Sequence, residues 1–447
     1  YKLILEDINQ NEIPNLKRCA CFLLEKMTNI YPICFEGGKL SDVIKVISSN
    51  LKNNNDASIV LYLCQSLQNI IKVIGDYNTN KSSCVLSNYF DSIFNRLYKD
   101  ANTEIMNSKE STKCSLRRLM TIGTLIDYSS HDKQKEINDI ILRFLKEIES
   151  TQNSIDILQS KGISKETIFQ VQEIYYTLLQ KLFNKYKSRI KLDLEKNIWT
   201  LTEGLFTYRK NVFEEANLAL GALSKNMGKD FIPIFTNYYP YITFSIKSYN
   251  NNTLSKSGLL SLYNCINSTE DSINKSEDMI KILIDVCTSN DVTRNNKCIA
   301  ISCIGELLLY MGNDFEPYLE MVMKLLFSAA QMGVNVPPDS DEDLIDFVKQ
   351  LRYELIRTFT CIELTVKEDL LLNYIRDIVE FLKLCVNDNY IQTIDILKST
   401  LELIIDLFNL YGQNFKELCD KNFAEKLVGL FNVYGKKNDS DIEQNID

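Results

Sequence analysis

One motif occurs twice in the chain, 84 residues apart, and this repetition constrains the fold more than any other feature of the sequence. Met-Gly-x-Asp-Phe-x-Pro begins at Met227 and again at Met311. The agreement continues upstream, where Gly221 and Gly305 have the same offset. A shared register over about twenty-five residues indicates an internal repeat, whose units need neighbours to cover their apolar faces.

Apolar residues recur at the i, i+3/i+4, i+7 spacing of amphipathic helices along the whole chain. Only 15 Gly and 7 Pro interrupt 447 residues, which also favours helix. The motif offset then corresponds to two helix pairs of about 42 residues each. We expect pairs at 38–52 with 57–74, 86–100 with 111–127, 133–149 with 166–184, 187–206 with 210–227, 230–248 with 253–268, 274–289 with 292–311, 315–331 with 341–366, and 370–387 with 391–411. A partial pair is expected at 14–30 and a single helix at 415–434.

The repeated motif itself reads as the junction between two units. Gly228 and Gly312 are placed to end a second helix, and the proline of each motif suits the first turn of the next helix. Gly221 and Gly305 fall in mid-helix, where glycine costs about 1 kcal/mol relative to alanine. We expect this cost to be offset by the close approach of a neighbouring helix.

Composition excludes several classes of protein. The net charge of −9 argues against nucleic acid as the main partner. The thirteen cysteines include no CxxC pair, which fits reduced, buried thiols in a cytosolic or nuclear protein. No apolar run reaches the roughly 18 residues that a membrane span needs, so no membrane insertion is expected. With the lone His131, no phosphate-loop motif and no metal-ligand cluster, we expect no catalysis, no metal and no cofactor.

The stretch DVCTSNDVTRNNKCIAISCIGELL places Val292, Arg294, Ala300 and Gly305 after a polar turn. This pattern resembles that of HEAT-repeat proteins, and within them importin-β of the karyopherin-β family. The order and spacing of segments in 210–366 resemble the C-terminal half of importin-β, and weaker similarity extends over 1–434. The resemblance implies an all-α, right-handed superhelix of antiparallel helix pairs. It also implies one solenoid over 1–434, of about nine to ten repeats, with a polar tail at 435–447.

Some features depart from the family pattern. The closing helix with its inward-facing Trp is not recognisable after Phe431, and Tyr62 stands where relatives carry a Trp. Trp199, the only Trp, is assigned to core packing. The chain starts in mid-pattern with YKLILEDI, and the resemblance implies that about four-tenths of the family's chain is missing. We therefore expect weak Ran-GTP binding by this chain alone.

The resemblance implies a monomeric nuclear transport receptor that shuttles between cytoplasm and nucleus. Second helices would line a concave face that binds the basic importin-β-binding segment of importin-α, or a basic cargo, with release by Ran-GTP. An acidic face with aromatic residues suits an Arg/Lys-rich helix through charge pairs and cation–π contacts. The candidate residues are Tyr62, Glu173, Tyr176, Glu214, Glu215, Glu306, Glu354, Glu363, Glu402 and Asp406. The alternative for each carboxylate is an ordinary solvated side chain.

Two further surfaces are candidates. The acidic segment Asp339, Asp341, Glu342, Asp343 either contacts a basic patch of Ran or cargo, or, with Ser340, caps a helix. On the convex side, the resemblance implies grooves between first helices that accept phenylalanines of FG-repeat nucleoporins. The residues assigned to such a groove are Phe231, Ile234, Tyr238, Met279, Leu283 and Val286. The alternative is that they form plain inter-repeat core.

Two other functional classes stay open at this stage. A HEAT-repeat scaffold, such as a phosphatase scaffold or coat adaptor, would share the fold, because fold alone does not give function. It would be expected to show near-uniform repeats and no affinity for FG peptides. The helical region of a larger enzyme is a third possibility, with no catalytic signature to support it.

Overall fold

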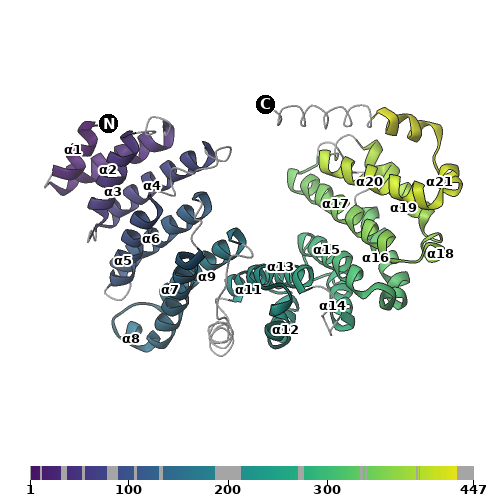
Figure 1. The fold of residues 1–447 in the computed structure, drawn as a ribbon, viewed down its shortest axis with the longest axis horizontal. Coiled ribbons are helices and arrows are strands. Elements are labelled where there is room, and N and C mark those ends of the chain that lie inside the picture. Colours follow the sequence, from purple (N-terminus) through teal and green to yellow (C-terminus); the bar gives the residue numbers. More distant parts are fainter. Residues whose placement is uncertain are drawn as a thin grey trace. The chain divides into compact units, whose positions relative to one another are not determined.

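The computed structural model describes residues 2–10, 13–31, 38–52, 56–77, 89–104, 108–129, 134–186, 213–269, 276–332, 336–337, 340–388, 391 and 393–429. Within these residues every regular element is a helix, which confirms the all-α prediction (Figure 1). The chain divides into two compact units, Tyr1–Met227 and Gly228–Asp447, each of which is described by itself.

Unit 1 is a row of antiparallel helix pairs. Its α-helices are α1 (Lys2–Gln10), α2 (Pro14–Ile30), α3 (Gly38–Leu51), α4 (Ala57–Tyr77), α5 (Phe90–Glu104), α6 (Lys109–Tyr128), α7 (Gln134–Asn153), α8 (Ile155–Ser160), α9 (Lys165–Lys185) and α11 (Phe213–Met227). Each second helix packs on the next, in the order α2, α4, α6, α9 and α11. First helices α3, α5 and α7 lie on the other side of the row (Figure 1).

Unit 2 repeats this arrangement. It contains η3 (Gly228–Phe231), α12 (Ile232–Ile246), α13 (Asn252–Thr269), α14 (Ser276–Thr288), α15 (Arg294–Met311), η4 (Gly312–Tyr318), α16 (Leu319–Met332), α17 (Glu342–Thr365), α18 (Glu368–Leu371), α19 (Ile375–Asn387), α20 (Ile394–Tyr411) and α21 (Gln413–Leu418), and residues 421–429 are also helical. The second helices α13, α15, α17 and α20 pack on one another in this order.

Gly228, Gly312 and Gly305 behave as the sequence predicts, whereas the close approach expected at Gly221 stays a prediction. Gly228 and Gly312 have positive φ angles of 56° and 53°, and each ends a second helix before a short 3-10 segment. A Cβ at Gly305 would lie 3.3 Å from the Thr358 Cα, so glycine at this position lets α15 and α17 approach closely. Thr358 uses this proximity to donate a hydrogen bond to the Ile301 carbonyl at 3.2 Å.

The structure departs from the predicted helices in a few places. The single helix expected at 415–434 is wrong, because Cys419 and Asp420 interrupt the helical backbone between α21 and 421–429. The helix expected at 370–387 is interrupted by a turn at 372–374 that separates α18 from α19, and the short helix α8 had no counterpart among the predicted elements. The helix expected at 187–206, Trp199, His131 and the tail at 435–447 lie outside the described residues. Continuity of one solenoid across both units stays a prediction.

One stretch of the described residues, Arg294–Met332, is apolar and long enough by composition to span a membrane. It comprises α15, η4 and α16, and 56% of its most apolar window is buried inside the protein. Cys298, Ile304 and Leu307 of α15 are completely buried. Core packing therefore accounts for the apolar character of this stretch.

Gly258 offers a test of how tightly the pairs pack. A Cβ at this position would lie 2.9 Å from the Ser245 Cβ and 3.0 Å from the Ile246 backbone nitrogen. We expect Gly258→Ala to lower the free energy of unfolding by about 1–3 kcal/mol, because α12 and α13 must separate. Gly429→Ala is the control, since nothing lies within 4 Å of its added Cβ. Urea denaturation measures both, and equal stability of the two variants would contradict this packing.

Candidate partner-binding surfaces

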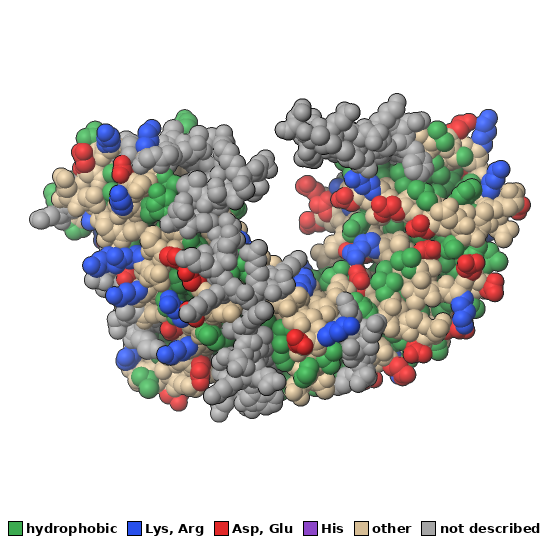
Figure 2. Space-filling view, in the orientation of Figure 1, with side chains coloured by type: hydrophobic (Ala, Val, Ile, Leu, Met, Phe, Trp, Pro, Cys, Tyr) green, Lys and Arg blue, Asp and Glu red, His purple; other side chains and the backbone are tan. Residues whose placement is uncertain are grey.

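The exposed side chains of α13, α15, α17 and α20 form what we call the second-helix face of unit 2. On α17 the buried residues fall on the remaining sides of the helix, and Tyr353, Arg357 and Leu364 are left on this face. Figure 2 shows Asp and Glu side chains gathered over α17. The face is therefore the place to examine the carboxylates that the sequence predicts.

Arg357 compensates part of this charge. It donates a hydrogen bond from Nη2 to the Glu306 Oε1 at 2.8 Å, and it lies 3.9 Å from the Glu354 Oε2. The Tyr263 hydroxyl also donates to the Glu306 Oε1, at 3.3 Å. Burial raises the pKa of Glu354. Arg357, 51 residues away in the sequence, thus already pairs with Glu306. Contact of Glu306 and Glu354 with a basic partner stays a prediction.

Glu363 and Asp406 form a contrasting pair on α17 and α20. Burial, and then the charge of Asp406, raise the pKa of Glu363. The Glu363 Oε2 is buried without a hydrogen-bond partner. Glu402 is exposed one turn before Asp406. Among the described residues, none of these three carboxylates has a Lys or Arg nitrogen within 4 Å.

Unit 1 contains a second acidic cluster, made by α9 and α11. Burial and the charge of Glu214 raise the pKa of Glu173. Burial also raises the pKa of Glu215, and Glu173 and Glu214 raise it further. These three carboxylates come from helices of two different repeats, and the sequence predicts that all three share one face. The structure brings them together.

The predicted aromatic residues of this face have different outcomes. Tyr176 is only 2% exposed, so its predicted contact with a partner is wrong: α9 turns it into the core. Tyr62 is half-buried, and its ring meets that of Phe22 edge-on, with the centroids 5.4 Å apart. The Lys26 ammonium lies 5.2 Å from the Phe22 centroid. Lys26 thus covers the Phe22 ring, and contact of Tyr62 with a partner stays a prediction.

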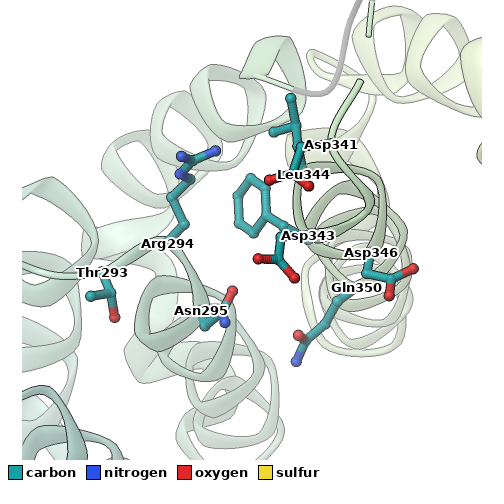
Figure 3. Close-up of a pocket in the computed structure, with 9 residues that line it drawn as sticks. Thr293, Arg294, Asn295, Asp341, Asp343, Leu344, Asp346 and Gln350 are labelled. Atoms are coloured by element: carbon teal, nitrogen blue, oxygen red, sulfur yellow. The ribbon is translucent and has the colours of Figure 1, made fainter. Parts of the chain in front are cut away.

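The acidic segment lies at the start of α17, beside a polar pocket of about 510 Å³ (Figure 3). Asp341 and Asp343 line this pocket with Asn295 of α15. Asp341 is the residue before the helix and makes no side-chain capping bond, so the predicted cap by Ser340 is wrong. Asp339 lies outside the described residues. Contact of this segment with a partner stays a prediction.

The predicted groove on the first-helix side is wrong at most of its positions. Phe231, Tyr238, Met279, Leu283 and Val286 are completely buried, because they fill the space between helices. Ile234 alone in this set is half-buried. These residues form inter-repeat core, as the alternative interpretation held.

Open grooves occur instead further along the first-helix side. One lies between α14 and α16, encloses about 660 Å³ and is lined by Ile284, Met321 and Met332 among others. A second, of about 750 Å³, lies between α16 and α19 and includes Phe327 and Phe381. Met321 and Met332 are more than half exposed. Two apolar residues on the outer side of an amphipathic helix were the sequence signal that could have revealed this site.

These observations define a class: an α-solenoid of HEAT repeats with an acidic second-helix face and apolar grooves between first helices. The family described as importin subunit beta-1-like, TPR repeats, matches residues 42–429. The chain belongs to this importin-β family.

Named relatives agree with this assignment. Importin subunit beta-1 of Schizosaccharomyces pombe is 24% identical over 348 residues, which cover 76% of this chain and 39% of the relative. The solved Kap95:Nup1 complex is similar with a TM-score of 0.71 at 16% identity, over 91% of this chain and 46% of the other. A structure in which Kap95p binding induces the switch loops of RanGDP to adopt the GTP-bound conformation also has a TM-score of 0.71, at 16% identity, over 95% and 50%. The chain thus spans half or less of the length of these relatives.

The α9–α11 cluster predicts a gain of stability on neutralisation. We expect Glu173→Gln with Glu215→Gln to raise the free energy of unfolding at pH 7 by a few tenths of a kcal/mol, the size of like-charge pairs on helices. Because the folded pKa values are raised, the native carboxyls hold protons more readily than unfolded ones. The wild-type chain therefore gains stability as the pH falls through the folded-state pKa values of Glu173 and Glu215. The difference in free energy of unfolding between the variant and the wild type then shrinks.

Urea denaturation at pH 7 and at pH 5 measures this difference. Glu166→Gln is the control, because hydrogen bonding to its own backbone N–H and to Ser164 lowers the pKa of this exposed glutamate of α9. Its neutralisation should not stabilise. A double variant no more stable than the wild type at pH 7 would show that the cluster is not repulsive.

Proposed function

We propose that this chain is the part of a nuclear transport receptor that binds a basic importin-α or cargo segment on its second-helix faces. We further propose that it binds FG-repeat nucleoporins on its first-helix side, is regulated by Ran-GTP, and shuttles between cytoplasm and nucleus. Membership of the importin-β family supports this proposal. The relative solved with Nup1 supports nucleoporins as partners, and the relative solved with RanGDP supports regulation by Ran.

The single observation that carries the proposal is that no Lys or Arg nitrogen in the described part of the chain lies within 4 Å of Glu363, Asp406 or Glu402. Burial and mutual repulsion keep the pKa of Glu363 high, so a nearby cation from a partner would relieve an unfavourable charge. Arginine and lysine side chains offer that cation, and many such pairs along a long segment add to affinity and steer association. A HEAT-repeat scaffold of another kind has no need of this feature.

Binding of a basic peptide tests the charge argument. We expect Glu363→Gln with Asp406→Asn to weaken the affinity of the 447-residue chain for an Arg/Lys-rich adaptor peptide by roughly tenfold at low salt. The loss should shrink at high salt, where screening already weakens the wild-type complex. Lowering the pH should also weaken binding, and earlier than for an ordinary glutamate, because protonation of Glu363 sets in at higher pH.

Fluorescence anisotropy with a labelled peptide gives these affinities. Glu277→Gln is the matched control: Glu277 is an exposed glutamate on the first helix α14, with Lys281 at 4.0 Å. Equal loss of affinity in the control, or wild-type binding without salt dependence, would refute the proposed site.

The apolar grooves beside α16 are the proposed FG sites in place of the buried residues predicted from the sequence. A phenylalanine ring needs an apolar slot, and methionine side chains such as Met321 and Met332 adapt well to such ligands. Ser328 is exposed and lines both grooves, so one position tests both.

We expect Ser328→Trp to lower the affinity for FG-repeat peptides at least tenfold, because the indole would obstruct the edge that the two grooves share. Ser328→Ala keeps the grooves open and should bind as the wild type does. Isothermal titration measures both, and circular dichroism checks that the Trp variant remains helical. Unchanged FG binding by the Trp variant, or no FG binding by the wild type, would favour the scaffold alternative.

A further inference from the structure

The first helices of unit 1 carry a group of cations at their middle and carboxyl-terminal parts. Their positions are Lys52 directly after α3, Arg96 and Lys99 on α5, and Arg143 and Lys146 on α7. All are exposed except Arg96, which is half-buried. Figure 2 shows Lys and Arg side chains gathered over α5 and α7. We call these five residues the basic edge, and their charge contrasts with the net charge of −9 of the whole chain.

Hydrogen bonds between α5 and α7 align the two helices along this edge. Arg143 of α7 donates from Nη1 to the Asn95 Oδ1 of α5 at 3.3 Å. About one turn further along both helices, the Tyr98 hydroxyl donates to the Glu147 Oε1 at 3.2 Å. The edge cations that adjoin these contacts in the sequence therefore lie at the same height on α5 and α7.

The buried side of α6 brings the end of α3 to the same edge. Arg118 of α6 donates from Nη2 to the carbonyl of Leu51, the residue before Lys52, at 3.0 Å. One turn earlier on α6, the Ser115 hydroxyl donates to the Ala101 carbonyl of α5 at 2.8 Å. The ends of α3 and α5 thus meet on one stretch of α6. With neighbouring helix axes about 8–10 Å apart, the basic edge crosses roughly 20 Å.

Two carboxylates beside the edge are turned toward the protein. Asp100 is only 3% exposed. Burial raises its pKa, and the charges of Arg118 and of the edge cations on α5 and after α3 oppose that rise. Glu147 is half-buried, and besides the bond from Tyr98 it accepts one from the Asn102 Nδ2 at 2.9 Å. The outer surface of the edge therefore keeps an excess of positive charge.

The first helices of unit 2 arrange their surface charges differently. Three of their lysines each pair with a glutamate three or four residues earlier in the same helix: Lys281 of α14, Lys324 of α16 and Lys383 of α19. Within the described residues, no carboxylate oxygen lies within 4 Å of Lys52, Arg96, Arg143 or Lys146. The basic edge thus lacks the local pairing that offsets comparable cations elsewhere in the chain.

We propose that the basic edge binds an acidic segment of a partner protein, which lies across the ends of α3, α5 and α7. An extended segment of about six residues spans the roughly 20 Å of the edge. Its Asp and Glu side chains pair with the edge cations, and the arginines offer bidentate hydrogen bonds to them. This surface is separate from those proposed above for basic segments and for FG repeats.

The carboxylates around the edge favour a short acidic segment over a nucleic acid. Asp42 and Asp139 are exposed in the first two turns of α3 and α7, and Glu149 is exposed one turn beyond Lys146. A nucleic acid carries a continuous row of phosphates and would meet these like charges on leaving the edge. A segment that is acidic only over the length of the edge would not.

A labelled peptide that alternates Glu with Gly tests the proposal with the 447-residue chain. We expect binding at low salt that weakens as salt is added. Lys52→Gln with Lys146→Gln should lower the affinity about fivefold or more, because two charge pairs are lost. Lys52→Arg with Lys146→Arg keeps both charges and should bind as the wild type does. Lys256→Gln with Lys398→Gln, at exposed lysines of α13 and α20, makes the same change in net charge and should leave the affinity unchanged.

Fluorescence anisotropy gives these affinities, and circular dichroism confirms that each variant is helical. Absence of peptide binding at low salt, or an equal loss in the two glutamine variants, overturns the proposal. A labelled oligothymidylate is the competing probe. If it binds more tightly than the peptide and loses affinity in the Lys52→Gln, Lys146→Gln variant, the edge is a nucleic-acid site and the acidic segment is refuted.

Discussion

The structure depends on one constraint: each helix pair leaves an apolar face that only the next pair can cover. Gly305 shows how strictly this is met, since even a methyl group there would lie 3.1 Å from the Thr358 Oγ1. Because a second helix is buried against its own partner and against both neighbours, one side alone remains for other molecules. The binding surface of such a protein is therefore assembled from single faces of successive helices, and its chemistry changes repeat by repeat.

This assembly concentrates charge that the fold alone would avoid. Glu173, Glu214 and Glu215 come from two helices: Glu214 raises the pKa of Glu173, and both raise the pKa of Glu215, in addition to the effect of burial. In unit 2, Arg357 compensates Glu306, whereas the described part of the chain supplies no such cation to Glu363 and Asp406. A cation from a partner would have most effect beside the carboxylates that lack a cation of their own. Unfavourable electrostatic energy of this kind persists at sites where binding relieves it.

Periodicity and breakers were enough to predict the helices and the junction at each repeated motif, since both are set by residues close in sequence. The site was less predictable, because it depends on how each helix is rotated and on pairing between repeats. Periodicity does not say whether an aromatic residue such as Tyr176 or Phe231 faces solvent or core, and both are buried. The pairing of Arg357 with Glu306 follows from the register of α15 against α17, which no local pattern reveals.

The two sides of unit 2 consequently differ in the ligands that they suit. The second-helix face carries the carboxylates and would, under the proposed function, receive one long segment, whose ordering cost must be offset by many contacts. The first-helix grooves beside α16 are separate and mix apolar with polar side chains, and Ser328 joins their rims. Weak, identical ligand units on one flexible chain can engage such adjacent grooves together, so that effective concentration rather than any single contact sets the affinity. Under the proposed function, unit 2 thereby combines one specific mode of binding on its second helices with one multivalent mode between its first helices.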